Sequence, residues 1–203
     1  MQLLRTVCGR RVGATGALQS PFSARPIDYP LIVVPFSLAP GKAATIVVSY
    51  DGIGASRHAM SIETPTSFAD RARVEAAKNF AFYGMMLVII ALATVALVTL
   101  REPVFAAYAT YLASILIYIA HGDGVAFQYL WPALPQLNSM AASVWGSAAL
   151  VFGGLFAMTF LQTARYHPIM HRVLLTVVIS ILVFAVVLWF ADPKLLNRLL
   201  VYV

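Results

Sequence analysis

Charge is scarce in this chain, and its scarcity excludes an ordinary soluble domain. Only 11% of the 203 residues are Asp, Glu, Lys or Arg, while 61% are hydrophobic and the mean hydropathy is +0.82. A soluble domain typically carries about 25% charged residues. Since roughly 20 apolar residues cross a bilayer, the composition predicts a membrane protein with about four or five crossings. Little chain is left for a separate catalytic domain.

Cysteine and clustered basic residues are lacking as well. The single cysteine, Cys8, excludes an intramolecular disulfide and a zinc site built from paired cysteines. The net charge of +6 comes from dispersed Lys and Arg residues, and none lies between Arg101 and Arg165. Nucleic acid is therefore not expected as a partner.

The side-chain combinations that carry catalysis are missing too. The sequence offers no nucleophile paired with a base, no paired carboxylates and no phosphate-binding loop, so we expect neither an enzyme nor a cofactor. His167 and His171 have the spacing of metal ligands on a helix, but a solvated loop is the favoured interpretation. His121 and Asp123 are expected to cap a helix end rather than to form a proton-sensitive pair.

Long uncharged runs locate the membrane crossings, because a charge at the bilayer centre costs about 2.5 to 3.5 kcal/mol. The charged run 70–78 is expected to extend the helix at 79–100 out of the membrane, and Ser139 is expected to cap the helix at 139–164. Residues 121–138 are expected to form a loop. The predicted membrane helices are 79–100, 103–120, 139–164 and 173–191, with a partial fifth helix, a stub too short to cross, at 195–203.

The first third of the chain has a different pattern, with short β-branched runs between Pro and Gly residues. It predicts strands at Leu31–Phe36, Ala44–Tyr50 and Arg57–Glu63, the last two joined by a glycine-containing hairpin over 51–56. Three strands are too few for a stable sheet core, so part of this β domain is expected to lie upstream. Residues 1–12 lack the apolar stretch of a signal peptide.

These patterns together define the expected fold class. Residues 1–68 are interpreted as a partial extracellular or periplasmic β domain, and residues 69–203 as a transmembrane helical domain. The expected architecture is a membrane all-α helical bundle preceded by a small antiparallel β-sandwich fragment.

The loop after the second predicted helix holds the most specific string of residues. It has two interpretations: an aromatic belt at the level of the lipid headgroups, or a rigid extramembrane lid on which a sensory domain pushes. The candidate signal-coupling residues are Phe127, Gln128, Tyr129, Leu130, Trp131 and Pro132.

This string, together with Gly124 before it and Leu134–Asn138 after it, resembles a loop of the bacterial seven-transmembrane receptors with diverse intracellular signalling modules. The segments Pro21–Pro26 and Leu38–Gly41 look like the closing part of that family's extracellular β-sandwich. The resemblance covers about residues 15–203. It implies an outer, jelly-roll-like domain for a carbohydrate or another small molecule, coupled through helices to a cytoplasmic kinase, cyclase or phosphatase.

Against the family pattern, we expect only the input and transmission part, without an output module. The resulting prediction is a multi-pass receptor input domain in the bacterial inner membrane, with its amino-terminal domain in the periplasm. Its expected partners are the bilayer, a ligand of the outer domain and further copies of the chain. The alternatives are a receptor-gene fragment without function, or a transporter or channel subunit, which the absence of ionisable residues in the apolar runs disfavours.

Basic residues favour the cytoplasmic side of a membrane protein, and their count near the ends of the crossings slightly favours an amino-terminal domain in the cytoplasm. Three arginines lie in the predicted inner loops and five basic residues near the outer ends. Folded domains cross membranes largely regardless of charge, so the orientation implied by the resemblance is kept.

Overall fold

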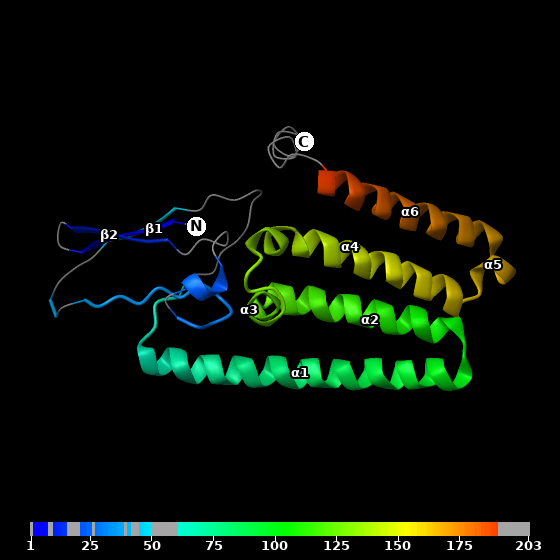
Figure 1. Cartoon of the computed structure of the whole chain (residues 1–203), viewed down its shortest axis with the longest axis horizontal. Coiled ribbons are helices and arrows are strands. Elements are labelled where there is room, and N and C mark those ends of the chain that lie inside the picture. Colours follow the sequence, from blue (N-terminus) through cyan, green and yellow to red (C-terminus); the bar gives the residue numbers. More distant parts are fainter. Residues whose placement is uncertain are drawn as a thin grey trace. The chain divides into compact units, whose positions relative to one another are not determined.

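The computed structural model describes residues 2–7, 10–15, 21–25, 27–38, 40–41, 45–49 and 61–190. Its chain divides into two compact units, which are described separately. Residues 1–54, 118–144 and 189–203 make up the first unit, and residues 55–117 and 145–188 the second. Four long helices dominate the described chain, and Figure 1 shows each running antiparallel to the one before it. They are α1 (Pro65–Leu100), α2 (Pro103–Gly122), α4 (Pro135–Phe160) and α6 (Pro168–Phe190).

A single three-stranded sheet is formed by β1 (Gln2–Val7), β2 (Arg10–Thr15) and β3 (Thr45–Ser49). The strand order is β2-β1-β3 and both pairings are antiparallel, with Leu4 opposite Gly13 on one side and Val47 on the other. A second sheet packed on this one is not found among the described residues. The helical bundle is thus as expected, whereas the expected β-sandwich is not seen among the described residues, which form one sheet.

The strand predictions had mixed outcomes. The strand predicted at Ala44–Tyr50 is confirmed as β3. The strand predicted at Leu31–Phe36 is wrong: this stretch forms no regular element, and Pro30 before it and Pro35 within it lack the N–H groups that a sheet ladder needs. Of the strand predicted at Arg57–Glu63, residues 57–60 lie outside the described part, as does the 51–56 connection, and 61–63 are irregular.

Helix α1 begins well before the apolar run, as the charged stretch 70–78 predicts. The Thr64 hydroxyl accepts a hydrogen bond from Ser67 N at 3.3 Å, and Pro65 occupies the first turn, where its missing N–H costs nothing. The helix ends at Arg101, which adopts a left-handed conformation with φ of 55° and donates its N–H to Leu97 O at 2.8 Å. A tight corner then leads into α2.

Prolines also set the start of α4 and α6, and this corrects two predicted boundaries. Helix α4 begins at Pro135 rather than at Ser139, and α6 begins at Pro168 rather than at residue 173. In both cases proline suits the first helical position better than the serine or valine that the hydropathy pattern selects. Helix α4 ends at Phe160 rather than at residue 164, because Gln162 turns left-handed with φ of 46°.

Two short helices complete the described chain. Helix α3 (Val125–Tyr129) lies in the stretch that was predicted to be a loop, and α5 (Thr163–Tyr166) joins α4 to α6. The predicted stub at 195–203 lies outside the described residues.

Small and aromatic residues hold the helices of the second unit together. Tyr111 of α2 stacks on Phe156 of α4, with ring centroids 6.2 Å apart and planes at 7°. A Cβ added at Gly153 would meet the Tyr111 ring at 3.0 Å, and one added at Gly154 would lie 2.5 Å from Val178 Cγ2 of α6. Glycine thus permits the close approach of neighbouring helices, as in many lipid-embedded bundles.

The outward faces of these helices are apolar. All four long helices are long and apolar enough to cross a membrane, and only 6% to 17% of their most apolar stretches is buried within the protein. Val98 of α1 is 71% exposed, and Leu150 of α4 is 62% exposed. Such a surface is stable against lipid chains rather than water. The protein is therefore a multi-pass membrane protein in contact with the bilayer.

Candidate functional site

A turn between α2 and α3 creates a position that only glycine fits. Gly124 adopts φ of 77° and its N–H bonds to His121 O at 3.0 Å. A Cβ at this position would overlap the carbonyl oxygen of Pro30, so the chain near residue 30 lies directly against the turn. The left-handed conformation and the close contact both exclude a side chain here.

Phe22 and Phe127 form the apolar centre of this contact. Phe22 belongs to the short 3₁₀ helix Phe22–Ala24, and Phe127 to α3. Their ring centroids are 5.7 Å apart with planes at 78°, the edge-to-face arrangement that aromatic pairs favour. Phe127 is 1% exposed and Phe22 is 8% exposed. We call residues 21–25 and 27–30 the docked segment.

Arg25 closes the docked segment over the two rings. Its guanidinium carbon lies 4.6 Å from the centroid of the Phe22 ring and 5.2 Å from that of Phe127. The same group donates hydrogen bonds to the backbone oxygens of Tyr29, at 3.0 Å, and Pro30, at 2.7 Å. Burial lowers the pKa of Arg25, although an arginine starts so high that it keeps its charge. One cation thus binds both rings and folds the segment back on itself.

Two further hydrogen bonds fix the register of the contact. Phe22 donates its backbone N–H to Pro132 O at 2.9 Å. The Gln128 side-chain amide donates to Asp28 Oδ1 at 2.8 Å. Both bonds join residues about a hundred positions apart in the chain, and they specify one arrangement where apolar packing alone would permit sliding.

Trp131 anchors the chain that follows the carboxyl end of α3. It is 7% exposed, its indole N–H donates to Asn138 Oδ1 at 3.4 Å, and its ring centroid lies 6.4 Å from that of His121. Trp131 thus contacts His121 at the end of α2 and hydrogen-bonds Asn138 at the start of α4. The ring of His121 therefore packs against protein groups beside the helix end.

The six predicted coupling residues do not behave alike. Phe127 and Trp131 are buried, Gln128 and Pro132 hydrogen-bond the docked segment, and Tyr129 and Leu130 are 63% and 59% exposed. An aromatic belt requires outward-facing rings, and of the three rings in this string only that of Tyr129 faces outward.

Sequence reasoning missed the partners of these residues. Phe22, Arg25 and Asn138 complete the site, and none of them was predicted to contact this loop. The only local signal for Phe22 and Arg25 is an aromatic and a cation between two prolines, Pro21 and Pro26. Nothing in such a short segment indicates a partner a hundred residues away.

The chemistry of the site is that of a docking contact. Within the described part of the chain, no group of three or more His, Cys, Asp or Glu side chains is placed to hold a metal ion. His167 is exposed at the α5–α6 junction, and His171 Nδ1 lies 3.0 Å from the buried hydroxyl of Thr163. Rings, a cation and backbone oxygens make up the α3 contact, and they hold two chain segments together.

A comparison with known protein families finds a match for the helical part of the chain. The family model described as 7TM diverse intracellular signalling matches residues 75–203, more than half of the chain. No curated protein and no solved structure matches.

Proposed function

The chain belongs to the 7TM diverse intracellular signalling family, and on that premise we propose that it is the input part of a receptor whose docked segment passes a signal to the helices through α3. The observation that carries the proposal is the Phe22–Arg25–Phe127 contact. It links the chain between β2 and β3 to the connection between two membrane helices.

The position of α3 in the chain suggests how a signal would pass. Helix α3 lies between α2 and α4 in the chain, and Trp131, which follows it, contacts His121 of α2 and hydrogen-bonds Asn138 of α4. A movement of the docked segment therefore acts on the connection of two helices at once. Two packings of a helical bundle can differ by a few kcal/mol, so a small change in free energy at one end is enough to shift the population from one packing to the other.

The proposal includes a location and partners. The amino-terminal part, with its three-stranded sheet, belongs to an outer β-sandwich domain in the periplasm, and the helices lie in the bacterial inner membrane. A carbohydrate or another small molecule is the ligand of the outer domain. The receptor acts by conformational change, possesses no catalytic activity of its own in this region, and assembles as several copies.

The direct test is a signalling assay in a full-length receptor of the family that carries the corresponding residues. Phe127→Ala and Arg25→Gln remove two parts of the contact, and Leu130→Ala is the matched control because Leu130 is exposed on the same stretch. We expect the first two variants to change output several-fold while membrane insertion, measured by alkali extraction, is retained. Unchanged output in both would contradict the proposal.

A flux assay separates the receptor from the transporter or channel alternative. The apolar run 79–100 and its three counterparts contain no Asp, Glu, Lys or Arg with which to build an ion pathway. Liposomes containing the chain should therefore be as tight to ions and small sugars as empty liposomes. Saturable uptake by the protein-containing liposomes would support transport instead.

A further inference from the structure

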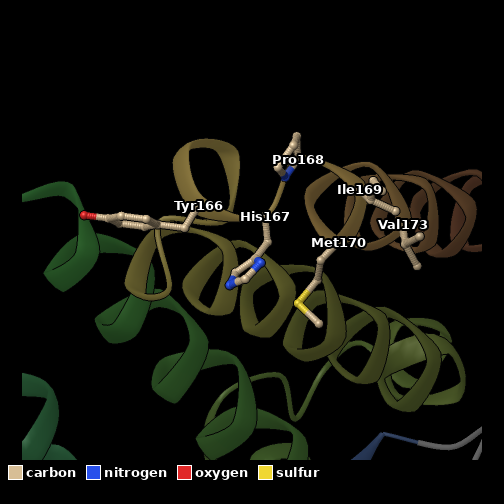
Figure 2. Close-up of a pocket in the computed structure, with 6 residues that line it drawn as sticks. All are labelled: Tyr166, His167, Pro168, Ile169, Met170 and Val173. Atoms are coloured by element: carbon tan, nitrogen blue, oxygen red, sulfur yellow. The ribbon is translucent and has the colours of Figure 1, made fainter.

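An apolar groove lies beside the start of α6, within the helical unit. Its volume is about 460 Å³, which falls in the range of small-molecule sites. Figure 2 shows the His167 and Met170 side chains directed to the same side of the chain, while Tyr166 extends away from α5. The residues that line the groove are Tyr166, His167, Pro168, Ile169, Met170 and Val173.

The groove is open along its length and almost entirely apolar. Ile169 is 79% exposed, Met170 is 54% exposed and Val173 is 57% exposed. These three side chains begin a helix long and apolar enough to cross a membrane. A flexible hydrocarbon chain fills such a hollow better than water, because each buried methylene contributes about 0.8 kcal/mol to binding.

Unpaired positive charge borders the same groove. Arg165 precedes its first lining residue and Arg172 lies between two others, Met170 and Val173. The guanidinium of Arg165 lies 5.7 Å from the centroid of the Tyr166 ring, which keeps it beside the groove. Both arginines are exposed, and neither forms an ion pair with a described residue.

The local sequence offers these arginines no acidic partner. No Asp or Glu occurs from residue 124 to residue 191. The site therefore combines an apolar hollow with two uncompensated cations at one end of a membrane helix. A ligand that matches both parts has a hydrocarbon tail and a negatively charged head.

We propose that the α5–α6 junction binds an anionic glycerophospholipid, with its phosphate between Arg165 and Arg172 and one acyl chain along Ile169, Met170 and Val173. Guanidinium groups bind phosphate oxygens through paired, charge-assisted hydrogen bonds. Basic pockets beside transmembrane helices select anionic lipids in the same way. This site lies outside the α3 contact, so it is independent of the proposed receptor function.

The test compares lipid binding by the full chain and four variants in native mass spectrometry, with phosphatidylglycerol and phosphatidylcholine as probes. Arg165→Gln with Arg172→Gln removes both cations. Arg101→Asn is its matched control, because Arg101 is another loop arginine and Asn tolerates its left-handed backbone. Val173→Trp fills the groove, and Leu175→Trp places the same ring on the opposite face of α6, at a position that is 40% exposed.

We expect the wild-type chain to prefer phosphatidylglycerol over phosphatidylcholine by roughly 10- to 30-fold, at about a factor of five for each arginine near the surface. The double glutamine variant should lose this preference, and R101N should keep it. Val173→Trp should weaken binding of both lipids, and Leu175→Trp should leave both unchanged.

Two results would overturn the assignment. One is equal phosphatidylglycerol binding by the wild-type chain and the double glutamine variant. The other is a dimer that Val173→Trp dissociates while lipid binding stays unchanged, because the groove would then be an interface for a second copy of the chain.

Discussion

Phe22 packs its ring edge-to-face against Phe127, and Arg25 lies over both rings. This contact joins the amino-terminal part of the chain to the short helix α3 between two membrane helices. Its components are unlike those of the rest of the protein. The long helices meet through glycines and stacked rings, whereas the docked segment adds a cation and directed hydrogen bonds to its ring contact.

The first prediction concerns the ring of Phe127. Replacing it with alanine leaves a cavity at a position that is 1% exposed, and such truncations cost about 3 to 5 kcal/mol. We expect faster hydrogen exchange at the Phe22 amide, which bonds Pro132 O, in detergent micelles. Leu130→Ala should leave that exchange unchanged. Equal protection in F127A and the wild-type chain would show that the ring does not hold the segment.

The second prediction uses two glycines of one turn. Gly124→Ala should displace the docked segment, since the added Cβ overlaps the Pro30 carbonyl and the left-handed backbone costs a further 1 to 2 kcal/mol, roughly. Gly122→Ala faces open space at the end of α2 and should be neutral or slightly stabilising. Limited proteolysis near residue 30 measures the difference, and equal cleavage of the two variants would contradict the close contact.

The third prediction tests the hydrogen bond between Trp131 and Asn138. Asn138→Leu leaves the buried indole N–H without its acceptor, at a cost of about 1 to 3 kcal/mol. Trp131→Phe removes the donor instead. In thermal unfolding, the double variant should be more stable than the sum of the two single losses predicts. Strict additivity would mean that the bond contributes nothing.

The fourth prediction is a pH dependence at the start of α1. Hydrogen bonds from Arg71, at 3.0 Å to each carboxylate oxygen, lower the pKa of Glu63 below its usual range. A lowered folded-state pKa means that the stabilising contribution is complete above the unfolded value of about 4.5 and is lost as the pH falls through the folded value.

Amide protection of residues 63–68 should therefore decrease below about pH 4.5, the ordinary value of the Glu63 carboxyl. Glu63→Gln should show low protection at every pH, with no such step. A step of the same size in the glutamine variant would assign the dependence to another carboxylate.

Much of the helical part was predictable because it depends on a local quantity. Hydropathy over about 20 residues decides whether a segment is stable in lipid. Four runs are apolar enough, and this result does not depend on their tertiary contacts. The exact ends were not predictable from hydropathy. Pro135 and Pro168 extend two helices into polar sequence, because proline favours the first turn whatever its neighbours' polarity.

The strands and the docking contact depend on distant partners, and the sequence predicted them poorly. Strand β1 pairs with β3 across some forty residues, and its sequence was considered only as a leader. The α3 loop could be selected from its aromatic string. Phe22 and Arg25 could not, because one ring and one cation in a short segment have no periodicity that indicates where they dock.

The most direct test of the account measures whether the α3 contact sets the arrangement of the membrane helices. Spin labels are placed at Val98 of α1 and Ile179 of α6, both exposed, in a chain with Cys8 replaced by serine. Pulsed dipolar spectroscopy in nanodiscs then compares the label-to-label distance in the parent chain, F127A and L130A. The account predicts a shifted or broadened distance distribution for F127A alone; identical distributions in all three would contradict it.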